Sequence, residues 1–316
     1  MIYLVTGANG YIGQALVQRL LDDHAMPENR RVTKLVLFDR QFDAPANDPR
    51  VQQIEGDITR MECVEALAQT RPDVVFHLAS GASGRAETEF ELGLQGNLHG
   101  TMQLFEALRR LQTVPVVVFT STIAVFGTQM PAVMDDDTAP NPELSYGAHK
   151  RMLEILLADY SRRGFLQGRA VRLPGIVVRP AAPNGAWSVF SSTLLRSLAT
   201  GQPCTMPVSP QATLWLMSLA CCIDNLLHAA AMEQPREMVW TLPALRVSVA
   251  DIVAAFDRRT SGQAGRLVTY APLPDIQAQF GSLPPLKTPA AENAGFRHDL
   301  DIDTLIDRAT AHIPKT

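Results

Sequence analysis

The chain has 316 residues, of which 46% are hydrophobic and 19% are charged, the balance of an ordinary folded protein rather than a disordered one. The formal net charge of −4 and the pI near 6.0 exclude the basic surface that nucleic acid or an anionic membrane attracts. A small-molecule partner is therefore expected, with no nucleic acid and no membrane.

Short apolar runs alternate with longer amphipathic stretches through the first half of the chain, a pattern typical of parallel strands joined by helices. The strands are expected at residues 3–6, 34–38, 51–55, 74–78, 114–120 and 168–173. The helices between them are expected at residues 12–22, 63–69, 89–110 and 146–163. This order predicts an α/β fold of Rossmann type, with a doubly wound parallel sheet.

Prolines become frequent after Arg179-Pro180, and shorter helices are expected there at residues 219–233 and 249–259. We expect an NAD-binding Rossmann domain over residues 1–170, rejoined by residues 211–240. Residues 171–210 and 241–316 are expected to form a smaller α/β lobe that binds the substrate.

Neither a targeting segment nor a metal site is expected. The first strand begins at once and leaves no room for a signal peptide. The longest apolar stretch, residues 114–127, is shorter than the roughly 18 to 20 residues that span a bilayer. The four cysteines form no Cys-x-x-Cys pair, and Asp135-Asp136-Asp137 is interpreted as a solvated loop, so a reducing cytoplasm and no metal are expected.

A glycine-rich turn follows the first strand in Thr6-Gly7-Ala8-Asn9-Gly10-Tyr11-Ile12-Gly13. Gly7 permits a tight turn, Gly10 lets the backbone approach a pyrophosphate, and Gly13 allows the helix to pack on the strand. Because the helix that begins here presents free N–H groups, the motif predicts a dinucleotide site.

Asp39 ends the second strand, where its carboxylate can accept hydrogen bonds from both hydroxyls of an adenosine ribose. It would repel a 2′-phosphate, so NAD is expected rather than NADP, although Arg40 beside it softens that preference. Asp57 and Ile58 close the third strand and are expected to border the adenine.

Tyr146 and Lys150 are four residues apart and therefore share one face of a helix. A free tyrosine has a pKa of roughly 10, and a nearby cation favours its phenolate. Tyr146 is therefore expected to take a proton from the substrate hydroxyl, and Lys150 to hold the nicotinamide ribose. Thr122, at the end of the fifth strand, is expected to orient the substrate oxygen, with Ser121 as the alternative. Asn97 on the preceding helix is expected to brace the site.

These motifs together resemble the extended short-chain dehydrogenases/reductases, the NAD-dependent epimerase/dehydratase superfamily. Further motifs that carry the resemblance are His77-Leu78-Ala79-Ser80, Asn97-x-x-Gly100-Thr101 and Tyr146-x-x-x-Lys150. The family places its catalytic hydroxyl where Thr122 stands, which favours Thr122 over Ser121. The resemblance also implies a homodimer, formed through helices near residues 97–110 and 146–163. It assigns cofactor contacts to Leu78, Ala79, Ser80, Asn97, Pro174 and Ile176, with Ser80 also near the substrate.

Two departures narrow the reaction. Dehydratases of the family carry an Asp-Glu pair where this chain has Ile123 and Ala124. Nucleotide-sugar epimerases usually show Asn-x-Tyr-Gly-Pro after the sixth strand, where this chain has no such asparagine. The run from Arg172 to Pro180 instead is similar to the D-erythronate dehydrogenase subgroup, which oxidises the C2 hydroxyl of a four-carbon sugar acid.

Recognition of a substrate carboxylate is then expected from Arg172 or Arg179, each able to form a two-pronged pair, with Asn184 nearby. Either arginine could instead pair with a structural carboxylate. The leading expectation is an NAD-dependent dehydrogenase of a small sugar acid. A nucleotide-sugar 4-epimerase and an NAD-binding regulatory protein without activity are the alternatives.

Overall fold

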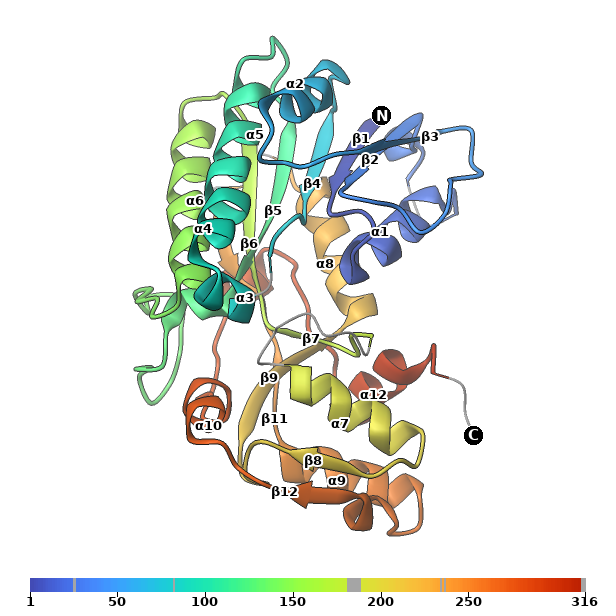
Figure 1. The fold of residues 1–316 in the computed structure, drawn as a ribbon, viewed down its shortest axis with the longest axis vertical. Helices are drawn as coiled ribbons and strands as arrows, with labels where there is room; N and C mark the ends of the chain where they lie inside the picture. Colours follow the sequence, from blue (N-terminus) through green and yellow to red (C-terminus); the bar gives the residue numbers. More distant parts are fainter. Residues whose placement is uncertain (25–26, 82, 181–188, 234, 236, 314–316) are drawn as a thin grey trace. The chain divides into compact units, whose positions relative to one another are not determined.

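The computed structural model describes residues 1–316 except 25–26, 82, 181–188, 234, 236 and 314–316 (Figure 1). The chain forms two compact units. Unit 1 comprises Met1–Val125, Leu144–Arg172 and Leu226–Trp240, and unit 2 comprises Phe126–Glu143, Leu173–Asn225 and Thr241–Thr316.

Unit 1 contains a seven-stranded sheet in the order β10-β6-β5-β4-β1-β2-β3. Its strands are β1 (Ile2–Thr6), β2 (Lys34–Asp39), β3 (Val51–Glu55), β4 (Val74–His77), β5 (Val116–Thr122), β6 (Gln167–Leu173) and β10 (Val239–Thr241). The strand pairs β1/β2, β1/β4, β2/β3 and β4/β5 are parallel, so these strands end at one common edge. The order reverses at β1, and ligands of such sheets bind at this reversal. The Rossmann-type fold predicted from the sequence is confirmed.

The helices that begin in unit 1 are α1 (Tyr11–Leu21), α2 (Met61–Gln69), α3 (Ser83–Thr88), α4 (Phe90–Gly93), α5 (Gly100–Arg109) and α6 (Ser145–Arg162). Of these, α1, α2, α5 and α6 bury apolar side chains. Leu4, Val36 and Val75 alternate along their strands with residues of the opposite face and share a core with α2, α5 and α6. Helix α8 (Leu219–Ala231) begins in unit 2 and ends in unit 1.

Two elements differ from their predicted forms. The strand expected at residues 114–120 runs from Val116 to Thr122, because Ser121 and Thr122 continue its extended backbone. The helical stretch expected at residues 89–110 is present, but its middle part, Leu94–His99, is π-helical and separates α4 from α5. Glycines at 96 and 100 have low helix propensity, and π-turns are frequent at functional sites.

Unit 2 is built around a three-stranded sheet of order β11-β9-β7 and a two-stranded sheet of β8 and β12. Its strands are β7 (Gly175–Val177), β8 (Cys204–Met206), β9 (Thr213–Ser218), β11 (Leu245–Ser248) and β12 (Val268–Tyr270). Its helices, besides the start of α8, are α7 (Phe190–Ala199), α9 (Val249–Arg259), α10 (Pro274–Phe280), α11 (Pro289–Asn293) and α12 (Ile302–Thr310). Apolar side chains of α7, α9, α12 and β9 form a core of its own.

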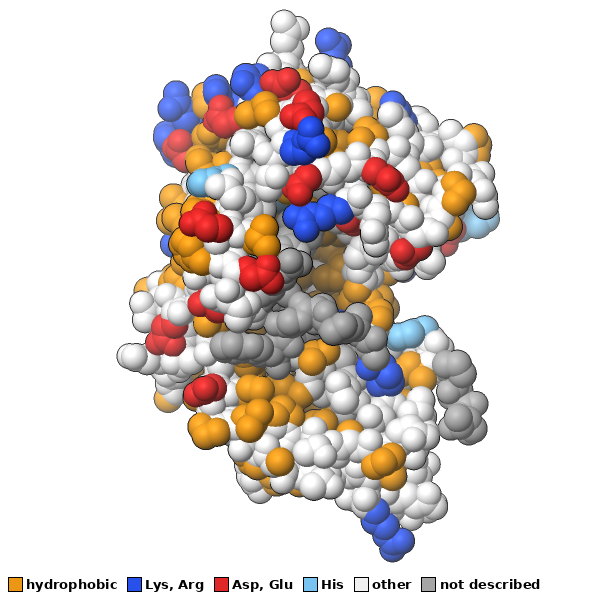
Figure 2. Space-filling model, viewed as in Figure 1, with side chains coloured by type: hydrophobic (Ala, Val, Ile, Leu, Met, Phe, Trp, Pro, Cys, Tyr) orange, Lys and Arg blue, Asp and Glu red, His pale blue; other side chains and the backbone are white. Residues whose placement is uncertain are grey.

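On the face shown in Figure 2, acidic and basic side chains are interspersed and form no large patch of one charge. Among the described helices, none is both long enough and apolar enough to cross a membrane. The division of the chain into a cofactor domain and a substrate lobe remains a functional prediction.

Candidate active site

The turn after β1 brings its backbone very close to the segment that follows β4. Gly7 has a φ of 73°, in the left-handed region that glycine tolerates. A Cβ atom at Gly7 would lie only 2.7 Å from the backbone nitrogen of Ala79. Helix α1 starts at Tyr11 with no side-chain cap and no acidic residue in its first turn. The N–H groups of its first turn and its positive dipole end therefore suit an anion such as a pyrophosphate.

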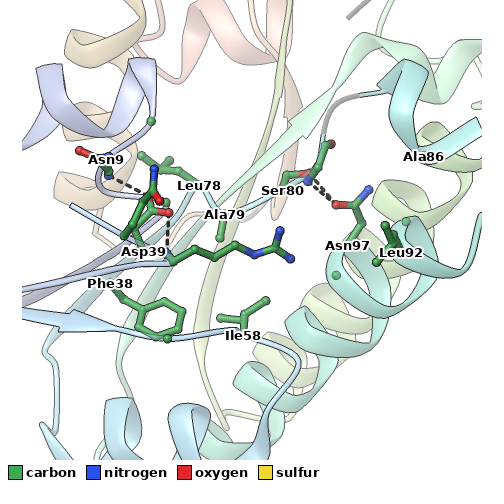
Figure 3. A pocket seen from close by; sticks show the side chains of 18 residues that line it. Asn9, Phe38, Asp39, Ile58, Leu78, Ala79, Ser80, Ala86, Leu92 and Asn97 are labelled. Carbon is green, nitrogen blue, oxygen red and sulfur yellow. Dashed lines mark hydrogen bonds between the residues drawn. The ribbon is translucent and has the colours of Figure 1, made fainter. Parts of the chain in front are cut away.

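A cavity of about 500 Å³ lies beside this turn, at the edge of the sheet where β1, β2 and β4 end (Figure 3). Nine residues predicted to bind the cofactor line it, namely Gly7, Asn9, Gly10, Asp39, Ile58, Leu78, Ala79, Ser80 and Asn97. Phe38, Arg40 and Leu92 also line it and were not predicted. Eight residues predicted to bind the cofactor are not among its lining residues, namely Tyr11, Ile12, Gly13, Asp57, Tyr146, Lys150, Pro174 and Ile176. Their contact with the cofactor remains a prediction.

Asp39 is held by two backbone N–H groups at the cavity wall. Its Oδ2 accepts a hydrogen bond from Asn9 N at 2.8 Å, and its Oδ1 accepts one from Arg40 N at 2.8 Å (Figure 3). A carboxylate oxygen has two acceptor positions, so both oxygens retain capacity for ribose hydroxyls. The Arg40 guanidinium lies 3.4 Å from the Asp57 carboxylate, which partly neutralises the cation beside Asp39.

Replacing Asp39 tests the ribose contact. An Asp39→Ser variant is expected to bind NAD about 10-fold more weakly and to lose preference over NADP, because hydrogen bonds to charged groups contribute about 1.5–3 kcal/mol. Dissociation constants for both cofactors measure the ratio. Asp43→Ser is the matched control, since it removes an exposed carboxylate from the same stretch of chain that is not among the residues lining the cavity. An unchanged ratio in Asp39→Ser would contradict the assignment.

Asn97 presents an unpaired donor at the other wall of the cavity. The residue is 2% exposed, and its Oδ1 accepts hydrogen bonds from Gly81 N at 2.6 Å and Ser80 Oγ at 3.1 Å. These donors fix which end of the amide is the oxygen. Its Nδ2 is buried without a hydrogen-bond partner among the described residues. Because an unmet buried donor costs about 1–3 kcal/mol, a ligand with acceptor oxygens suits this position.

Tyr146 and Lys150 meet at the start of α6, beside the end of β5. Lys150 is 2% exposed, and its Nζ donates a hydrogen bond to Thr120 O at 2.8 Å. The same atom lies 5.7 Å from the centroid of the Tyr146 ring and 4.6 Å from that of Phe119. The fold therefore brings the phenol and the ammonium together as their spacing predicts, with the cation over an aromatic face.

Burial lowers the pKa of Lys150 to about 7, although the negative charge of Glu154 opposes the shift. In the unfolded chain the amine keeps its proton up to a pKa near 10.5, so the unfolded state binds more protons between these two values. Stability contributed by this site is therefore lowest below about pH 7 and rises toward about pH 10.5.

A Lys150→Met variant should remove this pH dependence. We expect it to gain stability relative to the parent at pH values below about 7, and the gain to shrink as pH rises toward 10.5, by at most about 1.4 kcal/mol per pH unit. Urea unfolding of both proteins across this range measures the difference. A difference independent of pH would show that Lys150 is not buried as a titrating group.

Ser121 and Arg172 are both occupied by Glu154, which is 0% exposed. Ser121 Oγ donates to Glu154 Oε1 at 2.5 Å, and Arg172 Nε and Nη2 donate to the two carboxylate oxygens at 2.9 and 2.8 Å. Arg151 reaches the same carboxylate from the surface at 2.9 Å. Arg172 therefore pairs with a structural carboxylate, which was the second interpretation of this residue from the sequence. The hydroxyl of Ser121 donates its hydrogen to the same carboxylate. We leave both out of the proposed substrate site.

Thr122 remains available at the end of β5. Its Oγ1 accepts a hydrogen bond from Ala124 N at 3.1 Å, which leaves the hydroxyl hydrogen for another acceptor. The residue is half-buried, unlike its buried neighbour Ser121. Because side chains alternate along a strand, Ser121 points toward Glu154 and Thr122 points to the other face. The orientation of the substrate oxygen by Thr122 remains a prediction.

Comparison with known proteins agrees with this geometry. Residues 3–213 match the model of the NAD dependent epimerase/dehydratase family. The chain belongs to this family. It is 36% identical over 318 residues to a D-erythronate dehydrogenase from Cupriavidus necator, covering 97% of both chains. It is 34% identical over 258 residues to a D-erythronate dehydrogenase from Haemophilus influenzae, covering 80% of this chain and 81% of the relative.

A solved structure described as a nucleoside-diphosphate-sugar epimerase from Agrobacterium tumefaciens is also similar. It shares 34% sequence identity with a TM-score of 0.92, over 99% of this chain and 94% of that chain. The resemblance predicted from the motifs is therefore confirmed. As a member of the epimerase/dehydratase family, the chain is an enzyme that uses NAD.

The residues present fit NAD. The glycine turn leaves no space for a Cβ atom beside Ala79, the start of α1 lacks an internal cap, and Asn97 Nδ2 lacks a partner among the described residues. The uncapped start of α1 suits a pyrophosphate, the buried Asn97 donor suits a ligand oxygen, and the tight turn at Gly7 leads directly into the start of α1. NAD is the cofactor that the sequence predicted.

Three further predicted residues, Pro174, Ile176 and Arg179, lie in unit 2. Pro174 is buried, and Ile176 is 1% exposed in β7, where it pairs with Met217 of β9. The backbone nitrogen of Arg179 donates to Ser192 Oγ at 3.0 Å. Asn184 lies outside the described residues. Contacts of these four residues with cofactor or substrate remain predictions.

Two residues near the site, Glu154 and His77, were not predicted from the sequence. Glu154 lies four residues after Lys150, so its place on the same helix face was a signal. His77 belongs to a motif that carries the family resemblance but received no role, since its hydrogen-bond partners Thr6 and Thr101 are far from it in sequence. Within the described residues, no group of three or more His, Cys, Asp or Glu side chains is arranged to hold a metal ion.

Proposed function

We propose that the protein is an NAD-dependent dehydrogenase that oxidises a secondary hydroxyl of a small sugar acid, the C2 hydroxyl of D-erythronate or a close analogue, to give a 2-oxo acid. The observation that carries the proposal is the pairing of Tyr146 with the buried Lys150 beside the end of β5. The match to a D-erythronate dehydrogenase over 97% of the chain supports the substrate class, because it includes both compact units.

The reaction removes a proton and a hydride from one carbinol group. NAD, when bound, supplies the hydride acceptor. The Tyr146 phenolate takes the hydroxyl proton, and the nearby Lys150 ammonium stabilises that phenolate. Thr122 donates its hydroxyl hydrogen to the substrate oxygen and orients it. The C–H and O–H bonds are lost, and a carbonyl group forms.

Arg179 is our candidate for the substrate carboxylate, because its guanidinium can form two parallel hydrogen bonds to a carboxylate. Arg172 is not proposed for this role, since its guanidinium already donates two hydrogen bonds to the Glu154 carboxylate. Ser80 lines the cofactor cavity and is proposed to lie near the substrate as well.

A direct assay decides the reaction class. Purified protein with NAD and a panel of four-carbon aldonates should form NADH, measured by its ultraviolet absorbance. A nucleotide-sugar 4-epimerase is the second candidate because the similar Agrobacterium structure carries an epimerase description. It would convert UDP-sugars without net NADH. Binding of NAD with turnover of neither substrate class would support a regulatory protein.

We also propose a homodimer that pairs the π-turn and α5 with α6. Met102 on α5 and Met152 and Ile155 on α6 are 39%, 46% and 56% exposed, which gives this side of unit 1 apolar side chains to bury. Light scattering on the purified protein measures the assembly. A cytoplasmic location is proposed because all four cysteines are free thiols, which suits a reducing compartment.

A further inference from the structure

His77 is the last residue of β4, and its ring is completely buried. The ring stacks on Phe119 at a centroid distance of 5.9 Å and meets the edge of Phe105 at 6.2 Å. Each ring nitrogen nevertheless has a hydroxyl partner. Nδ1 lies 2.7 Å from Thr6 Oγ1, and Nε2 lies 2.8 Å from Thr101 Oγ1.

The direction of these hydrogen bonds follows from the number of hydrogens. Thr101 Oγ1 donates its single hydrogen to Asn97 O at 2.8 Å, so it can only accept from His77. Nε2 of His77 must therefore carry a proton. In a neutral ring, Nδ1 is then unprotonated and accepts the hydrogen of Thr6 Oγ1.

Burial keeps the ring neutral. The pKa of His77 falls to about 3, first because burial disfavours the charged ring and second because Lys150 is nearby. The elements packed around the ring are β1, β5 and α5, which supply Thr6, Phe119 and Thr101, together with α6. Among the described residues, Lys150 of α6 is the ionisable group that acts on it.

A chain of hydrogen bonds from Thr6 through His77 and Thr101 to Asn97 connects the two walls of the cofactor cavity. Thr6 precedes the glycine turn, and its Oγ1 also accepts from Ala79 N at 3.4 Å. At the other end, Asn97 holds Gly81 N through its Oδ1 at 2.6 Å. The carbonyl of His77 accepts a hydrogen bond from Thr120 Oγ1 at 3.1 Å. Because the carbonyl of Thr120 binds Lys150 Nζ, the chain of hydrogen bonds also reaches Lys150.

We propose that His77 is a positioning residue for NAD, fixed as the neutral tautomer with its proton on Nε2, and that it holds the glycine turn and Asn97 at the spacing the dinucleotide requires. A histidine suits this position because one flat ring carries an acceptor on one side and a donor on the other. The inference rests on the proposed NAD site and is independent of the substrate.

Nitrogen NMR of the protein labelled in its seven histidines tests the tautomer. One ring should show an unprotonated Nδ1 and a protonated Nε2, unchanged between about pH 5 and pH 8. Loss of that signal in a His77→Gln variant would assign it. A proton on Nδ1, or titration of this ring near its usual pKa of about 6.5, would overturn the proposal. The measurement uses the wild-type protein without substrate, so it stands even if a variant fails to fold.

A pair of substitutions at Thr101 tests the positioning role. Thr101→Val removes the hydroxyl that links His77 to Asn97 and is expected to weaken NAD binding about 10-fold. Thr101→Ser keeps the hydroxyl and should bind NAD like the parent. Fluorescence titration with NAD alone measures both constants, and thermal unfolding confirms that the variants are folded. Equal NAD affinity of folded Val and Ser variants would contradict the role, whatever substrate the enzyme uses.

Discussion

A Tyr146→Phe enzyme is expected to lose about 100- to 10,000-fold in turnover while its affinity for NAD stays close to that of the parent. The substitution removes the phenolic oxygen and keeps the ring over which the Lys150 ammonium lies, 5.7 Å from the ring centroid. The packing of α6 is therefore preserved, and only the proton acceptor is lost. NADH formation at saturating substrate measures the turnover number, and titration with NAD alone measures affinity.

Tyr160→Phe is the matched control for this experiment. Tyr160 lies on the same helix, and its hydroxyl donates to Glu106. It should leave turnover unchanged, since that hydroxyl already has a partner on α5. If the Tyr146 variant retained full turnover, or if both variants lost it equally, Tyr146 would not be the base.

A Glu154→Ala variant is expected to lose about 3–5 kcal/mol of unfolding free energy, because it leaves the Arg172 guanidinium buried without its counter-charge. The carboxylate is 0% exposed and binds Arg172 through both oxygens, so water cannot replace it without opening the core. Equilibrium urea unfolding followed by circular dichroism measures the change. Turnover should fall too, since Glu154 counters the effect of burial on the pKa of Lys150.

Two comparison variants separate charge pairing from packing. Arg151→Ala breaks a bond to the same carboxylate from a side chain that is 33% exposed, and should cost about 1 kcal/mol or less. A double variant, Glu154→Gln with Arg172→Met, removes both buried charges and should recover much of the loss. Similar costs for Arg151→Ala and Glu154→Ala would argue against a buried, desolvated pair.

Local rules were sufficient for much of the site. The glycines at 7, 10 and 13 specify a turn between strand and helix, because only that backbone can approach so closely. Asp39 ends a strand next to that turn, and the sheet edge then brings the two together. The spacing of Tyr146 and Lys150 is a property of any α-helix.

Contacts between elements that are far apart in the sequence could not be predicted from local spacing. Ser121, Glu154 and Arg172 come from β5, α6 and β6, and their meeting depends on how α6 lies against both strands. Sequence spacing does not contain that alignment, so Arg172 was open to a substrate role and Ser121 to a catalytic one. The π-turn that carries Asn97 was likewise not predicted, because its hydrogen bonds span five residues instead of four and amino-acid composition does not distinguish the two helix types.

The sequence by itself determined the fold class, the family and the cofactor, since each depends on residues close together in the chain and on the order of strands and helices. Only the tertiary structure decided which polar side chains are free and which are paired, because pairing depends on distances between strands and helices far apart in sequence. Thr122 keeps an available hydroxyl, whereas Ser121 next to it gives its hydroxyl to a buried carboxylate.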